Sequence, residues 1–126
     1  MTDPTQLSIL VAEDDSLLRM MASDLFEEAG FKVEEAASGE SALRQLGDGP
    51  IAALFTDVEL GGDVDGFKLA RIAHQRNPGT AILIVSGRRT PNAADLPPGA
   101  IFVSKPYDLD RVLESLRSMI GQANAT

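Results

Sequence analysis

The chain has 126 residues, of which 19 are Asp or Glu and 11 are Lys or Arg, so its formal net charge is −8 at pH 7 and its sequence pI is about 4.5. This length predicts one domain, and the lack of cysteine excludes disulfides, thiolate nucleophiles and Cys-ligated zinc or iron–sulfur sites. The acidic balance argues against a surface for nucleic acid or anionic membrane, both of which need clustered Lys and Arg. Because the N-terminus also has neither a basic region nor a long apolar run, we expect a cytoplasmic protein.

Short apolar runs rich in Val, Ile, Leu and Phe alternate with longer amphipathic stretches. This is the pattern of repeated βα units and a parallel sheet. The predicted strands are residues 7–12, 32–36, 51–56, 81–86 and 101–104. The first, third and fourth are continuous apolar runs, as in buried parallel strands. The second alternates with polar residues and is predicted to lie at an edge of the sheet.

Helices are predicted between most of these strands. Leu18, Met21, Ala22 and Leu25 recur at helical spacing and predict a helix over 16–29, ended by Gly30. A short helix capped by Ser38 or Ser41 follows and ends at Gly47. Further helices are predicted over 66–76, with a capping role for Asp65, and over 108–120 with a frayed tail after it.

The segment between the fourth and fifth strands differs from the others. Residues 87–100 contain three prolines and two glycines, which leave room for at most one helical turn around 92–95. We therefore predict a loop where a fourth helix belongs.

Polar side chains follow four of the five predicted strands. Since the carboxyl ends of parallel strands meet at one edge, these side chains should lie together. Two carboxylates about 4 Å apart near a surface repel by about 4 kcal/mol at an effective dielectric of 20. Such a cluster needs a cation, and Mg²⁺ prefers oxygen ligands. With a Lys and a hydroxyl nearby, the site is equipped to hold a phosphoryl group. The residues are Glu13, Asp14, Asp15, Asp57, Ser86 and Lys105.

Nearly the whole chain resembles the receiver domain of two-component response regulators. The resemblance rests on ILVAEDDSLLR, on the Asp57 that ends IAALFTD, and on DGFKLA, ILIVSG and FVSKPYD, in that order and spacing. It implies a flavodoxin-like, doubly wound, five-stranded parallel sheet in the order 2-1-3-4-5, here with the fourth helix short or missing. We expect a single receiver domain over 1–126, with an ordered core of about 6–121 and no output domain.

The resemblance also implies roles for individual residues. Asp57 would be the phosphoacceptor, Lys105 would pair with it, and Ser86 would bind the phosphoryl group. Mg²⁺ or Mn²⁺ would be held by Glu13, Asp14, Asp57 and the backbone carbonyl of Glu59. Phe102 stands at the aromatic switch position, and a cis peptide is expected at Lys105–Pro106. The donor would be a sensor histidine kinase or a histidine phosphotransfer protein, and a downstream protein would receive the signal.

The sequence departs from the usual receiver-domain pattern at three places. Glu13 replaces the commoner Asp, and Gly61-Gly62 replaces a rigid Pro after the phosphoacceptor, which predicts a mobile loop. Ser86-Gly87 resembles a receiver subgroup with a degenerate fourth helix that typically pairs with HWE-type kinases.

Several hypotheses remain open at the level of sequence. Glu59 and Arg88 could pair across the mouth of the site, and residues 88–99 could become ordered on phosphorylation. Asp14→Asn should raise the metal-free melting temperature by removing repulsion. The protein should not be an enzyme beyond gaining and losing its own phosphoryl group. The alternatives are a small Mg²⁺-dependent phosphoesterase, for which His74 is misplaced, and a flavodoxin-like cofactor carrier, whose phosphate the acidic loop would repel.

Overall fold

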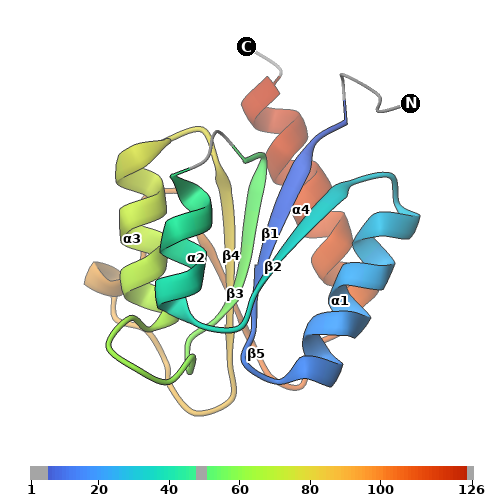
Figure 1. The fold of residues 1–126 in the computed structure, drawn as a ribbon. Helices are drawn as coiled ribbons and strands as arrows, with labels where there is room; N and C mark the ends of the chain where they lie inside the picture. The colour runs from blue at the N-terminus through green and yellow to red at the C-terminus, as the bar shows by residue number, and fades with distance from the viewer. Residues whose placement is uncertain (1–5, 48–50, 125–126) are drawn as a thin grey trace.

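A computed structural model describes residues 6–47 and 51–124. Five parallel strands form one sheet in the order β2-β1-β3-β4-β5, which confirms the predicted topology (Figure 1). The strands are β1 (Ser8–Ala12), β2 (Lys32–Ala36), β3 (Ala53–Asp57), β4 (Ala81–Ser86) and β5 (Ile101–Ser104). The helices are α1 (Ser16–Glu28), α2 (Gly39–Leu46), α3 (Gly66–Arg76), the 3₁₀ turn η1 (Ala93–Asp95) and α4 (Leu109–Asn124).

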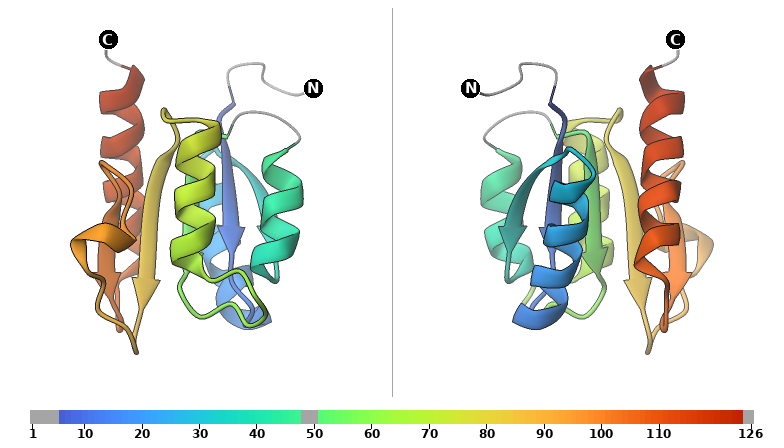
Figure 2. Two further views of the ribbon diagram at one scale, coloured as in Figure 1. Left: turned by 90° about the vertical axis from the view of Figure 1, so that its left-hand side faces the viewer. Right: turned by 90° about the vertical axis from the view of Figure 1, so that its right-hand side faces the viewer.

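The central strands are buried on both faces because helices cover both sides of the sheet. Helices α2 and α3 lie on one side, and α1 and α4 lie on the other (Figures 1 and 2). Strands β3 and β4 are buried along their whole length, as their continuous apolar sequences predict. The core therefore has two hydrophobic clusters, one on each face; Leu54 belongs to the first and Phe55 to the second. Within the described residues, no helix combines the length and apolar character needed to cross a membrane.

Local signals in the sequence explain where the helices begin and end. The side chain of Asp15 accepts hydrogen bonds from the amides of Leu17 and Leu18 and caps α1. Asp65 caps α3 by accepting from Lys68, as predicted. After α1, Gly30 adopts a φ of 100°, the left-handed conformation expected of a residue that ends a helix.

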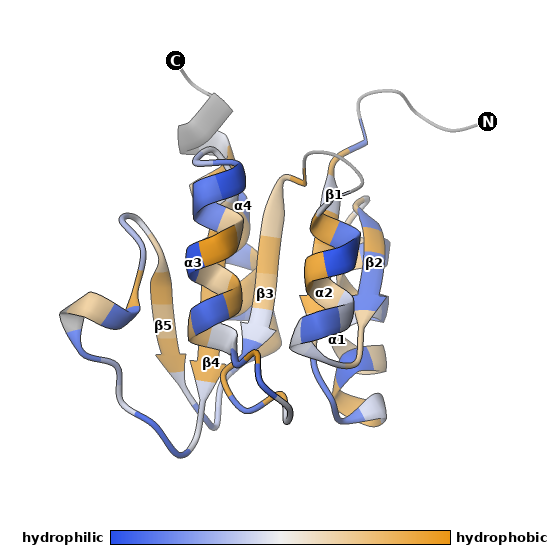
Figure 3. Cartoon of the chain, turned by 60° about the vertical axis from the view of Figure 1, so that its left-hand side comes forward, coloured by the Kyte–Doolittle hydropathy of each residue, from blue (hydrophilic) through white to orange (hydrophobic). Residues whose placement is uncertain are grey.

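The connection between β4 and β5 contains one 3₁₀ turn, η1, and no longer helix; the structure describes all of its residues. Figure 3 shows that the segment leaving β4 is hydrophilic, whereas β4 and β5 themselves are hydrophobic. The predicted loss of a fourth helix is thus confirmed.

Several predicted boundaries differ from those of the structure. Strand β1 begins at Ser8 rather than at residue 7, β3 begins at Ala53 rather than at residue 51, α1 ends at Glu28 rather than at residue 29, and α4 begins at Leu109 rather than at residue 108. Two further differences affect the carboxyl edge of β3 and the end of the chain. Asp57 is the last residue of β3 rather than the first after it, because its backbone still pairs in register with Val85 of β4. The C-terminal helix continues to Asn124, so residues 121–124 are helical rather than frayed. GQAN contains no proline to stop the helix, which explains the extension.

Candidate functional site

A cavity of about 370 Å³ opens at the carboxyl edge of the sheet. The loops after β1, β3, β4 and β5 all contribute to it, as the positions of the polar residues predict. All five acidic residues expected at this edge line it. The complete lining is Glu13, Asp14, Asp15, Leu18, Asp57, Glu59, Gly87, Arg88 and Lys105.

Asp57 lies at the floor of this cavity and is only 5% exposed. Its Oδ2 accepts from Nζ of Lys105 at 2.5 Å, and its Oδ1 accepts from the backbone amide of Glu59 at 3.1 Å. Gly66 at the start of α3 packs against the Asp57 backbone, since a Cβ there would lie 2.2 Å from the Asp57 carbonyl oxygen. A glycine is therefore required for α3 to approach the acidic residue this closely.

Lys105 supplies the positive charge nearest to Asp57. Burial by itself lowers the pKa of the Lys105 ammonium, but the hydrogen bond and charge of Asp57 outweigh burial and raise that pKa above its ordinary value. Lys105 therefore stays charged at neutral pH and offsets part of the negative charge of the site.

Glu13 is the second buried acid, also 5% exposed. Its Oε2 accepts from the amide of Asp15 at 3.2 Å, and its backbone carbonyl accepts from the Arg19 guanidinium at 2.8 Å. Burial raises the pKa of Glu13 to about 7, and Asp14 and Asp57 add to the rise. Ionisation of Glu13 in the folded protein therefore costs free energy.

The acidic residues that follow Glu13 are less buried than Glu13 and Asp57. Asp14 is exposed, and Asp15 uses its carboxylate to cap α1. Among the residues that the structure describes, no group of three or more acidic, His or Cys side chains is arranged to hold a metal ion. The predicted ligands Glu13, Asp14, Asp57 and Glu59 share the cavity but do not converge on one point within it.

Ser86, the last residue of β4, is 1% exposed and has three hydrogen-bond partners. Its Oγ donates to the Glu59 carboxylate, with Oε1 at 2.9 Å and Oε2 at 3.1 Å. It accepts from the amides of Arg88 at 3.2 Å and Arg89 at 3.1 Å. The predicted Glu59–Arg88 pair was therefore wrong, because a buried hydroxyl lies closer to Glu59. The neighbouring Arg89 instead pairs with Asp65 at 3.0 Å.

Ser86, Phe102 and His74 are not part of the cavity lining. Phe102 is partly buried and packs against the cluster on the α2–α3 side of the sheet. Lys105–Pro106 is cis, as predicted. His74 lies on α3 and does not line the cavity, as expected of a residue misplaced for phosphoesterase chemistry.

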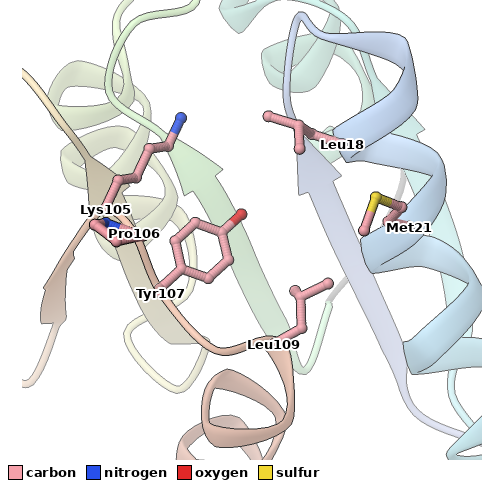
Figure 4. A pocket seen from close by; sticks show the side chains of 6 residues that line it. All are labelled: Leu18, Met21, Lys105, Pro106, Tyr107 and Leu109. Carbon is pink, nitrogen blue, oxygen red and sulfur yellow. The ribbon is translucent and has the colours of Figure 1, made fainter.

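Sequence reasoning missed a second cavity, of about 440 Å³, between α1 and the segment after β5. In Figure 4, Leu18 and Met21 point from α1 across this space toward Tyr107 and Leu109. These two residues belong to the apolar spacing that predicted the helix, but Leu18 is 37% and Met21 47% exposed. The clue in the sequence was that α1 has more large apolar residues than one stripe needs, since Leu17 and Met20 are also exposed.

The two cavities are neighbours, because Leu18 and Lys105 line both. An apolar pocket therefore lies directly beside the acidic one.

The profile of the response regulator receiver domain family matches residues 9–117. The chain belongs to this family. The receiver domain is 32% identical over 116 residues to the response regulator receiver protein CpdR of Brucella abortus, with 89% of this chain and 95% of the relative covered. It is 30% identical over 119 residues to the sensor kinase CckA of the same organism, covering 90% of this chain but 12% of the kinase.

Solved structures agree with the receiver fold. A receiver protein from Sinorhizobium medicae superposes with a TM-score of 0.90 at 24% identity, covering 97% of this chain and 100% of the other. The receiver domain of the hybrid histidine kinase CckA gives a TM-score of 0.75 at 30% identity, covering 90% and 98%. The predicted family and fold are confirmed.

Proposed function

We propose that this receiver domain is a phosphoacceptor module of a two-component phosphorelay and that Asp57 carries the phosphoryl group. One observation supports this most strongly: a buried carboxylate at the carboxyl edge of the sheet is paired with Lys105 inside an open polar cavity. Four strand ends converge there, so several groups can contact one phosphoryl group.

The chemical step follows from the donor class. A carboxylate oxygen of Asp57 attacks the phosphorus of a phosphohistidine, the new O–P bond forms, and the P–N bond breaks with its electron pair passing to the imidazole. Lys105 then lies where its ammonium can offset charge on the transferred oxygens. The amide of Glu59 donates to Asp57 Oδ1 and helps to orient the carboxylate for attack.

The cavity supplies oxygen donors of the kind that Mg²⁺ takes, although their side chains do not converge on one point in this structure. Two buried carboxylates and the exposed Asp14 share one cavity, and burial disfavours the charged form of Glu13. Glu13, Asp14 and Asp57 would hold the ion, together with water and the carbonyl of Glu59. Mg²⁺ bound there would offset the negative charge that the acids and the phosphoryl group bring together.

The partner that supplies the phosphoryl group would dock on the apolar surface of α1, which comprises Leu17, Leu18, Met20 and Met21. This surface borders the acidic cavity through Leu18 and Lys105, so a bound histidine protein would place its phosphohistidine close to Asp57. We propose a sensor histidine kinase or a histidine phosphotransfer protein in this role. The likeness to the receiver region of a sensor kinase supports this class of partner.

The test is phosphorylation with acetyl phosphate and Mg²⁺, followed by intact mass. The wild-type protein should gain one phosphoryl mass, and Asp57→Asn should gain none. Asp63→Asn, which alters an exposed acid in the same loop, is the matched control and should behave as wild type. Mass gain in Asp57→Asn, or steady turnover of a phosphoester by the wild type, would contradict the proposal and favour a phosphoesterase.

A further inference from the structure

The hydroxyl of Ser86 is fully occupied in this structure. A serine hydroxyl has one proton to donate and two lone pairs to accept with. Here the proton goes to the Glu59 carboxylate, and the amides of Arg88 and Arg89 donate to the oxygen. Ser86 is 1% exposed, so it cannot easily gain other partners from solvent. It can bind a phosphoryl oxygen only by releasing Glu59.

Glu59 is hydrogen-bonded to two of the residues that would bind a phosphoryl group. Its backbone amide donates to Asp57 Oδ1, and its carboxylate accepts from Ser86. Glu59 lies two residues after Asp57, and Asp57 pairs in register with Val85, the residue before Ser86. The Glu59 carboxylate therefore occupies the hydrogen bond that a phosphoryl group at this edge would need.

We propose that Glu59 is a positioning residue that competes with the phosphoryl group for the Ser86 hydroxyl and so opposes the phosphorylated state. This inference rests on the proposed function. A phosphoryl group on Asp57 brings a charge of about −1.5 to −2 near the Glu59 carboxylate and repels it. Ser86 then redirects its hydroxyl hydrogen bond from the Glu59 carboxylate to a phosphoryl oxygen.

The change in the hydrogen bonding of Ser86 also affects the segment between β4 and β5. Ser86 Oγ anchors the first two amides after Gly87, and the Arg89 side chain connects this segment to Asp65 at the start of α3. When Ser86 turns toward the phosphoryl group, these amides lose their acceptor. Glu59 thus influences how firmly the start of the segment is held.

Beryllofluoride with Mg²⁺ is a suitable probe, because it binds reversibly to a carboxylate oxygen as a tetrahedral anion and so yields an equilibrium constant. Amide NMR would follow its binding to full-length wild type and variants. Glu59→Ala frees Ser86 and removes the repulsion, so beryllofluoride should bind about tenfold more tightly. Glu59→Gln keeps an acceptor for Ser86 without the charge and should give a smaller gain. Glu114→Ala removes an exposed acid from α4 and should change nothing.

The decisive comparison repeats Glu59→Ala in a Ser86→Ala background. If Glu59 acts through Ser86, most of the tenfold gain disappears there. A gain that persists in full would show simple charge repulsion and overturn the inference, as would unchanged binding in Glu59→Ala. The amide spectra also establish that each variant is folded. Failure of the wild type to bind beryllofluoride or to be phosphorylated would instead overturn the proposed function, and this inference with it.

Discussion

The cavity around Asp57 has two walls that differ in construction. The acidic wall, residues 13–15, follows the buried strand β1 and is held by a dense set of bonds. The amide of Glu13 donates to Ala36 of β2, the carboxylate of Asp15 caps α1, and Arg19 binds the Glu13 carbonyl. The backbone of Glu13 and the carboxylate of Asp15 are consequently held in place, whereas Asp14 is exposed.

The other wall is the start of the β4–β5 segment (residues 87–100), of which Gly87 and Arg88 line the cavity. It contains only the short turn η1, and Arg88 and Arg89 are exposed. Its first residues are held by the Ser86 hydroxyl and by one ion pair with Asp65. Negative charge is therefore built into the rigid wall, whereas the wall that can rearrange carries positive charge and few anchors.

Neutralising Glu13, the buried acid of the acidic wall, should have the largest effect on stability. Because folding raises the pKa of Glu13 from 4.5 to about 7, the folded state retains its proton between these values while the unfolded state loses it. The free energy of unfolding should therefore fall as pH rises from 4.5 to 7. Glu13→Gln should remove this fall and stabilise the metal-free protein at pH 8 by about 3 kcal/mol, at 1.36 kcal/mol per pKa unit.

Urea unfolding at several pH values measures this effect. Asp63→Asn is the control, because Asp63 is exposed and does not line the cavity; its stability should stay within about 0.5 kcal/mol of wild type. Asp14 contributes to this effect, because it adds to the rise of the Glu13 pKa, so the stabilisation expected of Asp14→Asn stays a prediction. If the free energy of unfolding depends on pH in the same way in wild type and Glu13→Gln, folding does not raise the pKa of Glu13 and the prediction is wrong.

Magnesium should stabilise the same wall by a somewhat smaller amount. A ligand at one hundred times its Kd that binds only the folded state adds about 2.7 kcal/mol. Mg²⁺ should therefore raise the melting temperature of the wild type, and Asp14→Asn should abolish the rise by removing a proposed ligand. Thermal scans with NaCl at matched ionic strength control for screening. A rise of the same size in Asp14→Asn would remove Asp14 from the set of ligands.

Loss of the α1 cap should have a still smaller effect. Asp15→Ala leaves the amides of Leu17 and Leu18 without their acceptor and should destabilise the protein by about 1 kcal/mol. Asp15→Ser keeps a capping oxygen and should retain most of the stability. If the two variants are equally destabilised, Asp15 stabilises the protein through its charge and not through its capping hydrogen bonds.

Much of this fold was predictable because short-range signals specify it. Continuous apolar runs identified β1, β3 and β4, and the prolines of residues 87–100 excluded a helix there. Asp57 and Lys105 were found because parallel strands bring their carboxyl ends to one edge. These inferences depend on spacing along the chain and on strand direction.

Side-chain partners across the site were not predictable in the same way. The pair between Glu59 and Ser86 depends on rotamers and burial at strand ends, and charge alone suggested Arg88 instead. The exposure of Leu18 and Met21 was missed for a related reason. Helical spacing shows that residues share a face, but whether that face is covered depends on how α1 packs against its neighbours.

Removing the ion pair of the rearranging wall should change global stability least. The Arg89 and Asp65 side chains are 53% and 33% exposed, and exposed pairs contribute under about 1 kcal/mol. Arg89→Ala should therefore leave urea unfolding almost unchanged. The local effect should be larger, because this pair is one of the few anchors of residues 88–99.

Amide hydrogen exchange in that range should therefore be faster in Arg89→Ala than in wild type. Arg88→Ala, which removes an equal charge without an ion pair, should not accelerate it. Exchange that is faster in both variants would attribute the effect to net charge. Exchange that is unchanged in both would mean that Ser86 alone holds the start of the segment, so that release of this hydroxyl is sufficient to free the wall.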